Sequence, residues 1–356
     1  MATYRAGIIG TGWIAESHAR GWKAAEGVEF AVIADTNDEA RQEFGDLFGV
    51  APESRYADFR EMLDREHLDI VSVCTWHPQH AEMTIAAAAR KPRVILSEKP
   101  MALGLGEADA MLVACQRNKV KLAIGHQTRF ALGAIEARRL IATGAIGQPV
   151  RLWAAVAGGL LNNGTHLIDL QRYLLGDPKT EWVLGNVERK TDRYERATAI
   201  EDACAGIIQY AGGAQGTIES DLAEQSPGGC VVVGTEGMLE VSRNVVRLFN
   251  AETAGWRKVM DGPESDASVD QARGIVDWIE GRVEDYRSDG LKARATLEIM
   301  MAIYESARRH EVVRMPLLTR SNPLDLMIES GQLPPERPGR YDIRSRLVRG
   351  EGMSWL

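Results

Sequence analysis

The sequence predicts an α/β protein with a doubly wound parallel sheet in its N-terminal part and an open, largely antiparallel sheet in a C-terminal α/β domain. Its first third alternates apolar, β-branched runs with helical segments, in a β-α-β rhythm. From Pro149 onward, short strand-like segments follow one another across turn signals such as Gly212-Gly213, which favours antiparallel pairing. A length of 356 residues also suggests more than one core.

The first segment, Ala6–Ile9, reads as a short buried strand, and a glycine-rich turn and a helix follow it. In the G-x-G-x-x-A spacing, Gly10 permits a tight turn, Gly12 lets backbone amides approach a pyrophosphate, and Ala15 lets the helix pack closely. The N–H groups and partial positive charge of the helix N-terminus favour phosphate. The turn therefore predicts a dinucleotide site that includes Gly10, Thr11, Gly12, Trp13 and Ile14.

An acidic residue, Asp35, ends the second strand, Val28–Ala34. A carboxylate at this position can accept both hydroxyls of an adenosine ribose and would repel a 2′-phosphate. Thr36 and Asn37 supply no adjacent cation, and Arg41 lies further along the next helix. The predicted cofactor is therefore NAD, with NADP less favoured.

The rest of the first domain continues the same rhythm. Helices are expected at Asp38–Phe48, Tyr56–Arg65, Gln79–Arg90 and Glu107–Asn118, and strands at Asp69–Cys74, Arg93–Ser97 and Val120–Gly125. Because ligands bind beyond the carboxyl ends of parallel strands, functional residues are expected just after them. Thr75, Trp76 and Gln127 are therefore candidates for the wall of the cofactor site, and Glu98 and Lys99 follow the fourth strand.

The second domain begins with a helix at about Ala131–Thr143. Strands are expected at Val150–Ala157, Glu181–Arg189, Ala203–Tyr210, Ala214–Asp221, Cys230–Val233, Met238–Val241 and Val245–Phe249, with helices at Thr165–Leu175, Gln271–Gly281 and Leu291–Arg309. From Pro316 the chain is proline-rich with little helical periodicity, which predicts an arm extended over a surface. The predicted domains are 1–125, 126–315 and an arm at 316–356.

Composition narrows the class of protein. The chain carries 42 basic and 50 acidic residues, a net charge of −8, and shows no basic run, so nucleic acid is not an expected partner. It has no apolar stretch of bilayer-spanning length and no evident signal peptide. Four widely spaced cysteines imply no disulfide framework, and the expected location is the cytoplasm. His77 and His80 lack carboxylate or cysteine neighbours at ligand spacing, so no metal is predicted.

Four motifs occur in order along the chain: the glycine turn, Glu98-Lys99-Pro100, Arg129-Phe130 and Gly164-Thr165-His166-Leu167-Ile168-Asp169. From about Ala6 to Val313 the sequence resembles the glucose–fructose oxidoreductase / inositol dehydrogenase family (Gfo/Idh/MocA). The resemblance implies a Rossmann domain followed by an α/β domain with an open sheet. It also implies hydride exchange between a nicotinamide and a sugar or cyclitol hydroxyl, and a homodimer or homotetramer packed through that sheet.

The chain departs from the family pattern in two places. Many members have Asp four residues before the motif histidine, where this chain has Asn162, and the segment from Val150 to Gly164 is shorter than expected. We hypothesise that the long tail supplies the missing pocket wall, in its own subunit or a neighbouring one. Deletion of 321–356 is then expected to raise the substrate KM and spare cofactor binding.

Two residues are the predicted catalytic pair. Lys99 resembles the family's motif lysine, and its ammonium would hold the reacting oxygen and join in proton transfer. His166 lies in the first turn of a predicted helix, whose positive end favours a neutral imidazole that can act as the base. Asp169, one turn on, would orient that ring, bind a substrate hydroxyl or remain a solvated surface carboxylate. Glu98 would orient Lys99 or touch the nicotinamide ribose.

Other candidates have weaker chemical arguments. Asn162 and Asn163 can donate and accept hydrogen bonds with a substrate hydroxyl, although Asn163 also suits a turn. Arg129 would reach substrate or nicotinamide, or form a salt bridge between domains. Trp153 would offer the substrate a stacking face. His80 resembles a family position with a structural role beneath the cofactor.

The predicted function is that of an NAD(P)-dependent oxidoreductase acting on a secondary hydroxyl, or the matching ketone, of a sugar, cyclitol or sugar derivative. Two alternatives remain open at this point: a non-catalytic, nucleotide-responsive regulator on the same fold, and redox-assisted elimination on a glycoside with tightly held NAD. A sensor has no need of the Lys99 and His166 pair, which favours the enzyme. Few cations are evident for a phosphorylated substrate, so the expected partner is an uncharged polyol.

Overall fold

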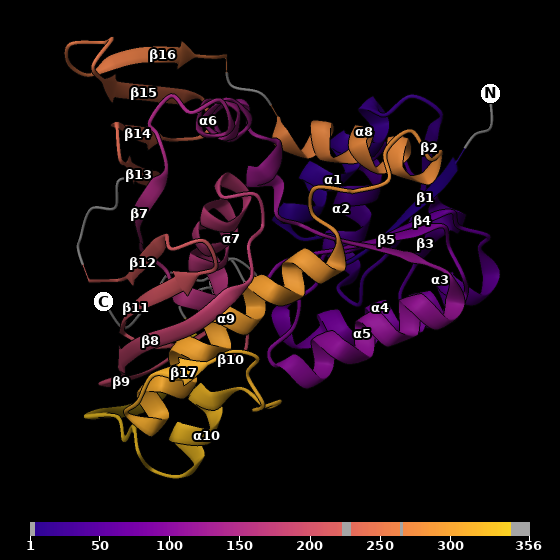
Figure 1. Cartoon of the computed structure of the whole chain (residues 1–356). Coiled ribbons are helices and arrows are strands. Elements are labelled where there is room, and N and C mark those ends of the chain that lie inside the picture. The colour runs from indigo at the N-terminus through magenta and orange to yellow at the C-terminus, as the bar shows by residue number, and fades with distance from the viewer. Residues whose placement is uncertain (1–3, 223–228, 264–265, 343–356) are drawn as a thin grey trace. The chain divides into compact units, whose positions relative to one another are not determined.

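The computed structural model describes residues 4–222, 229–263 and 266–342, which form two compact units (Figure 1). The first unit holds the described residues up to Ala102, with Glu107–Phe130 and Asp266–Arg294. The second holds Leu103–Gly106 and the described residues from Ala131 to 263 and from 295 onward. Residues 266–294 were expected in the second domain, but they pack with the first unit.

A parallel sheet forms the centre of the first unit. In the described residues it has six strands in the order β3-β2-β1-β4-β5-β6. Their bounds are β1 (Tyr4–Ile9), β2 (Val28–Ala34), β3 (Arg55–Tyr56), β4 (Ile70–Val73), β5 (Val94–Ser97) and β6 (Lys121–Ile124). Every neighbouring pair is parallel, so the carboxyl ends of all strands lie at one edge. This confirms the doubly wound parallel sheet.

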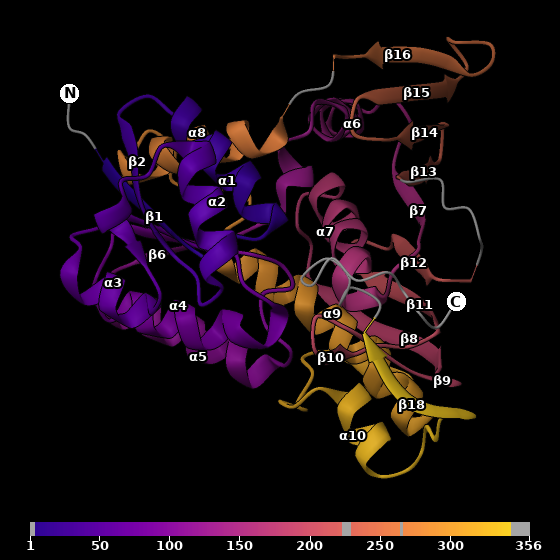
Figure 2. The same cartoon turned by 180° about the vertical axis from the view of Figure 1, so that it is seen from behind.

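Helices cover both faces of this sheet, as Figures 1 and 2 show from opposite sides. One layer contains α1 (Trp13–Ala24), α2 (Asp38–Phe48) and α8 (Ala267–Ile279), and the other contains α3 (Phe59–Arg65), α4 (His80–Ala88) and α5 (Leu105–Asn118). Short 3₁₀ turns occur at Pro52–Ser54, His77–Gln79 and Gln127–Phe130.

Helix α8 belongs to the first unit because small residues let it pack directly on α1. A Cβ at Gly21 would lie 3.1 Å from the Cβ of Ala272 and 3.0 Å from the carbonyl oxygen of Ser268. The core beneath includes the fully buried Trp22 and Ile275. Burial of these apolar surfaces recruits a segment that lies well over 200 positions further along the chain.

The helix predicted at Tyr56–Arg65 begins later than expected. Tyr56 instead pairs with β2 as part of the two-residue strand β3. Helix α3 starts at Phe59, because the Asp58 side chain accepts a hydrogen bond from the N–H of Arg60 at 2.8 Å and caps it. By contrast, α2 spans Asp38–Phe48 as predicted, between the cap Asn37 and the left-handed Gly49.

A mixed, largely antiparallel sheet forms the second unit. Its nine strands in the described part of the chain run in the order β16-β15-β14-β13-β7-β12-β11-β8-β17, and only the β12–β7 pair is parallel. Their bounds are β7 (Pro149–Val156), β8 (Thr180–Glu188), β11 (Ala203–Tyr210), β12 (Gln215–Ser220), β13 (Cys230–Gly234), β14 (Gly237–Val241), β15 (Val245–Asn250), β16 (Arg257–Asp261) and β17 (Val313–Arg314). The expected open, largely antiparallel sheet is confirmed.

Helices cover one face of this sheet. They are α6 (Leu132–Ala142), α7 (Thr165–Leu174) and the later part of α9 (Gly290–Arg309), which lie on the same side in both views (Figures 1 and 2). Glycines make the close approach possible, because a Cβ at Gly206 would lie 2.7 Å from Ile303 of α9 and one at Gly216 would lie 2.2 Å from Gln171 of α7. The opposite face carries no helix among the described residues.

The predicted arm contains a helix that the sequence analysis did not expect. Helix α10 (Pro323–Glu329) follows Asn322, whose side chain accepts from the N–H of Leu324 at 3.0 Å. Beyond it, β18 (Arg337–Asp342) pairs in parallel with β9 (Thr191–Glu195), which also pairs with β10 (Thr198–Ala199). The rest of the arm, 343–356, lies outside the described residues. No helix in the described part of the chain is long and apolar enough to cross a bilayer.

Candidate active site

The glycine-rich turn lies at the carboxyl end of β1 and opens onto α1. Gly10 has φ +89°, and a Cβ there would lie 2.8 Å from the carbonyl oxygen of Cys74. Gly12 caps α1 without a side-chain hydrogen bond, and a Cβ on it would meet nothing within 4 Å. Thr11 is buried and Trp13 is 75% exposed, with the partly buried Ile14 beside it. The first amides of α1 therefore face open space, as a phosphate cradle requires.

Asp35 is tied to this turn at the end of β2. Its carboxylate accepts from the N–H of Thr11 at 2.7 Å and the Thr11 hydroxyl at 3.0 Å, and from the N–H of Asn37 at 2.8 Å. Arg41 donates to the carbonyl oxygen of Asp35 at 2.6 Å and forms an ion pair with Asp38. The structure thus brings Asp35 together with the glycine turn.

His80 joins the ends of two further strands. Its Nδ1 lies 2.8 Å from the carbonyl oxygen of Pro100, after β5, and its Nε2 lies 3.0 Å from that of Thr75, after β4. The ring is fully buried, and this burial lowers its pKa below the ordinary histidine value, although the two carbonyl hydrogen bonds act in the opposite direction. Thr75 and Trp76 are both partly buried at this edge. His80 thus connects the segments that follow β4 and β5.

A buried pair that sequence reasoning missed supports Glu98. His18 of α1 places Nε2 3.1 Å from the Glu98 carboxylate and Nδ1 3.1 Å from the hydroxyl of Ser72. Burial acts to raise the pKa of Glu98, but the hydrogen bond and charge of His18 and the charge of Lys99 outweigh it, so the pKa is lowered. The only sequence signal for His18 was a polar residue on the helix face that carries Ala15 and Trp22.

The backbone at Lys99 is fixed by this carboxylate. The N–H of Lys99 donates to Glu98 at 3.0 Å, and the peptide bond between Lys99 and Pro100 is cis. Lys99 is itself only partly buried. Glu98 also lies close to the end of β6, as the space at Gly125 shows. A Cβ added to that glycine would lie 2.3 Å from Oε1 of Glu98. The structure therefore brings Glu98 and Lys99 to the same strand edge as the glycine turn.

The two candidates after β6 differ in exposure. Gln127 is partly buried at the strand edge. Arg129 is completely buried and donates to the carbonyl oxygen of Arg287 at 2.8 Å. Both residues of this contact belong to the first unit, so it fastens the chain after α8 rather than presenting a cation at the surface.

The second unit contains a π-helical turn, Leu160–Gly164, directly before α7. Asp221 accepts from the N–H groups of Gly158 and Gly159, each at 2.8 Å. The buried Glu201 accepts from the N–H of Leu160 at 2.6 Å and from the hydroxyl of Tyr304 at 2.7 Å. Burial raises the pKa of Glu201. Two carboxylates thus hold a π-helical segment, a type of turn that is frequent at functional sites.

His166 and Asp169 both lie on α7. His166 is partly buried in the first turn of α7, which continues directly from the π-helical turn. Asp169 is only 1% exposed, and its Oδ1 accepts from the hydroxyl of Thr296 at 2.9 Å. The alternative of a solvated surface carboxylate for Asp169 is therefore wrong.

Both asparagines of the turn bond to protein groups. Asn162 is 2% exposed, with Oδ1 3.0 Å from the guanidinium of Arg196 and Nδ2 3.4 Å from the carbonyl oxygen of Gly158. Asn163 donates to the carbonyl oxygen of Ala157 at 2.8 Å. These bonds give both residues a part in shaping the turn.

Trp153 lies on the face of the sheet that bears no described helix. Its neighbours in β7, Leu152 and Ala154, are buried on the α7 side, and Trp153 points the other way and is 39% exposed. Its indole donates to Glu219 at 3.0 Å. Within this unit the structure does not bring Trp153 together with His166, because side chains alternate between the faces of a strand.

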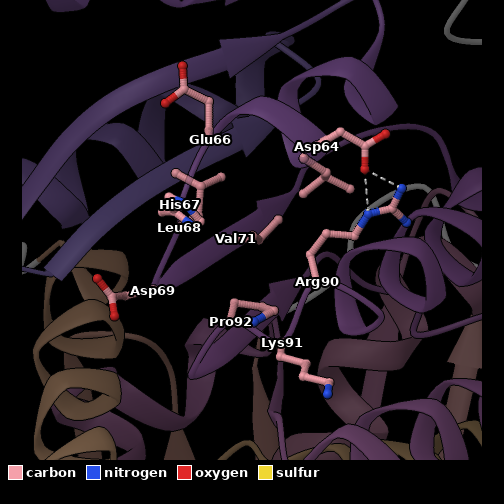
Figure 3. A pocket seen from close by; sticks show the side chains of 10 residues that line it. Asp64, Glu66, His67, Leu68, Asp69, Val71, Arg90, Lys91 and Pro92 are labelled. Atoms are coloured by element: carbon pink, nitrogen blue, oxygen red, sulfur yellow. Dashed lines mark hydrogen bonds and ion pairs between the residues drawn. The ribbon is translucent and has the colours of Figure 1, made fainter.

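A surface pocket of about 420 Å³ lies elsewhere in the first unit (Figure 3). Its lining residues precede or begin β4 and β5, at the amino-terminal edge of the parallel sheet. Asp64 pairs with Arg90 there, and Asp69 pairs with Arg93. The strand edge that bears Asp35 and Lys99 is the opposite one, so this pocket is not the candidate site. The described residues contain no cluster of three His, Cys, Asp or Glu side chains suited to a metal ion.

Two family models match the sequence. Residues 4–126 match the model described as "Oxidoreductase family, NAD-binding Rossmann fold", and residues 151–240 match the "GFO/IDH/MocA C-terminal domain". The two matches correspond to the parallel sheet and to much of the nine-stranded sheet.

Curated relatives and solved structures cover most of the chain. A D-apiose dehydrogenase of Paraburkholderia graminis is 27% identical over 92% of this chain and 94% of its own length. A myo-inositol 2-dehydrogenase of Thermotoga maritima is 27% identical over 69% of this chain and 74% of its own. The structure of a levoglucosan dehydrogenase with NADH and levoglucosan has a TM-score of 0.77 at 22% identity, covering 88% of this chain and all of that one. At that identity it shows the fold alone.

Proposed function

The chain belongs to the Gfo/Idh/MocA family of oxidoreductases, and from that premise we propose that it oxidises a secondary hydroxyl of an uncharged sugar or cyclitol, or reduces the matching ketone. It is an NAD-dependent dehydrogenase acting on CH–OH groups. The observation that carries the substrate class is the match to named sugar and inositol dehydrogenases through both units. We further propose that Lys99 and His166 handle the proton.

The residues at the strand edge fit the dinucleotide. The open space beside Gly12 and the uncapped amides of α1 suit its pyrophosphate, and the Asp35 carboxylate suits the adenosine ribose. Thr75, Trp76 and Gln127 supply the proposed wall, with His80 supporting the loop beneath. When bound, NAD supplies the hydride acceptor for alcohol oxidation.

Lys99 is proposed to bind the oxygen of the reacting carbon. Its backbone is fixed by Glu98, which is in turn held by His18, so the side chain starts from a rigid strand end. The ionised Glu98 carboxylate attracts the Lys99 ammonium. A cation held at this oxygen stabilises the negative charge that develops there as the hydroxyl loses its proton.

His166 is proposed as the base that takes the hydroxyl proton. His166 lies in the first turn of α7, directly after the π-helical turn, and a histidine side chain can accept a proton near neutral pH. Asp169 lies one turn on and is held by Thr296, from where it is proposed to orient the ring. The asparagines of the π-helical turn shape the approach to His166.

A substrate screen tests the proposal. The purified protein is incubated with NAD or NADP and a panel of aldoses, pentoses, cyclitols and uronic acids, and reduced nicotinamide is followed by its absorbance. Turnover of a neutral polyol with NAD supports the proposal. Binding of NAD without turnover of any sugar or cyclitol would contradict it and would favour a regulator.

Cofactor choice gives a second measurement. Asp35→Ala is expected to reduce the preference for NAD over NADP by about 10- to 100-fold, because a hydrogen bond to a charged group contributes about 1.5–3 kcal/mol. Dissociation constants for both dinucleotides measure the change. Glu43→Ala removes an exposed carboxylate from α2 and is the control, expected to leave the preference unchanged. An unchanged preference in Asp35→Ala would remove that residue from cofactor discrimination.

The helix-free face of the nine-stranded sheet supports a homo-oligomer. Across it, Leu184, Ile207, Thr217, Trp153 and Val231 are successive neighbours in the strand register. Leu184, Ile207 and Trp153 are each about 40% exposed. This row on the sheet face is apolar except for Thr217 and suits an interaction surface, and a second copy of the chain is the proposed partner.

Ile207→Glu is expected to split this homodimer or homotetramer into smaller species, because the interface would bury an unpaired carboxylate. Sedimentation velocity at micromolar concentration measures the change in mass. The matched control is Val113→Glu, which places the same charge on an exposed position of α5. An unaltered mass for Ile207→Glu would exclude this face as the interface.

The cysteines fit the cytoplasmic location that we propose for the enzyme. Cys74, Cys115, Cys204 and Cys230 are all buried free thiols. Burial raises the pKa of each, which keeps them as unreactive thiols. Such usage is typical of proteins in a reducing compartment.

A further inference from the structure

We propose that the C-terminal arm acts on the substrate site through one carboxylate: Asp342 holds Arg196 in place, and Arg196 positions Asn162 in the π-helical turn before His166. The inference rests on the proposed function, since it assigns positioning residues to the same site. All four residues belong to the second unit.

The first link is an unusual turn between β9 and β10. Arg196 and Ala197 are consecutive non-glycine residues with positive φ, at +48° and +63°. Side-chain-bearing residues seldom adopt this left-handed conformation, so something must hold it. One oxygen of Asp342 accepts from the N–H of Arg196 at 3.1 Å, and the other accepts from the N–H of Ala197 at 2.8 Å. The carboxylate thus binds both residues of the turn.

The pairing of β18 with β9 places Asp342 next to this turn. β18 runs parallel to β9, with Asp342 opposite Tyr194 and Arg337 opposite Thr191. The guanidinium of Arg340 lies 4.0 Å from the centre of the Tyr194 ring. The arm is therefore fastened along β9 up to the residue that caps the turn.

The second link is the guanidinium of Arg196. Its Nη1 lies 3.0 Å from Oδ1 of Asn162 and 3.0 Å from Oε1 of Glu195, a carboxylate that is fully buried. Glu195 balances the positive charge of Arg196. The guanidinium therefore acts as a rigid hydrogen-bond clamp and adds no net charge for an anionic substrate, which fits a neutral polyol.

The third link is the position of Asn162. Asp221 and Glu201 hold the backbone where the π-helical turn begins, and the Arg196 bond holds its middle. Asn162 lies four residues before His166. Loss of the clamp is thus expected to displace the segment that leads into the proposed base and, with it, the groups proposed to bind the polyol there, so that the substrate KM rises.

A double-mutant cycle tests the chain of contacts. Asp342→Ala and Arg196→Ala are each expected to raise the KM for the polyol by about ten-fold, with the NAD dissociation constant unchanged. The double variant should be no worse than Arg196→Ala alone, because both act through one path. Ala197→Gly added to Asp342→Ala is expected to restore part of the KM, since glycine adopts positive φ without strain. Glu329→Ala, an exposed carboxylate on the same arm, is the matched control.

Hydrogen exchange supplies a readout that does not need activity. Amides of residues 158–164 are expected to exchange faster in Asp342→Ala than in the parent or in Glu329→Ala. Additive KM effects, or a lower melting temperature with unchanged KM and unchanged exchange at 158–164, would overturn the inference. If no polyol is turned over although NAD binds, the proposed function fails, and the exchange result still decides the link between Asp342 and the turn.

Discussion

Replacing Lys99 with alanine is expected to lower kcat by about 10²- to 10⁴-fold while NAD still binds. The proposed ammonium stabilises charge that develops only as the hydroxyl loses its proton, so its removal affects the transition state more than the bound substrate. Because Glu98 keeps its bond from His18, the strand end is expected to retain its shape.

The measurement is steady-state turnover of the polyol found in the screen, together with NAD affinity from nicotinamide fluorescence. Lys23→Ala, which removes an exposed lysine from α1 of the same unit, is the matched control. Lys99→Arg separates the two proposed roles, since arginine retains the charge but does not exchange a proton near neutral pH. Full activity in Lys99→Ala would remove this residue from the mechanism.

The second large effect is expected for His166→Ala, again about 10²- to 10⁴-fold in kcat for alcohol oxidation. The loss should shrink as the pH rises, because hydroxide substitutes for a missing base. The acidic limb of the kcat/KM profile that belongs to the base should also disappear. His67→Ala, an exposed histidine of the first unit, controls for the loss of an imidazole.

Two outcomes would contradict this role for His166. One is a pH profile in His166→Ala that parallels the parent at lower amplitude, which would indicate displacement of the site rather than loss of a base. The other is unaltered turnover. Because NAD is proposed to bind the first unit alone, its affinity is expected to stay the same in this variant.

Sequence patterns located most elements of both units, because their signals are local. The predicted helix Asp38–Phe48 and the predicted strand Ala203–Tyr210 match α2 and β11 at both ends. The glycine turn and Asp35 also lie within one β-α-β unit. Such a unit carries its own caps, periodicity and turn residues, so the predicted parallel sheet follows from them.

The elements that were missed are short or depend on distant partners. Helix α10 has only seven residues, although Asn322 and Pro323 carried the start signal. Beside the β9–β10–β18 sheet, Asp342 accepts a hydrogen bond from Ala197, which lies 145 positions earlier in the chain. No local sequence pattern predicts such a contact. The role of His18 likewise depends on a distant residue, because it is the fold that places Glu98 within hydrogen-bond distance of its ring.

By itself the sequence determined the class of fold, the dinucleotide cradle and the family, because these depend on spacing within short stretches that any chain with those residues would share. Only the tertiary structure decided which polar side chains form hydrogen bonds within the protein and which remain exposed. It buried Arg129 against Arg287, held Asp169 with Thr296, turned Trp153 to the opposite face of the sheet and clamped Asn162 with Arg196. Burial and hydrogen-bond partners come from segments far apart in the chain, and no single stretch encodes them.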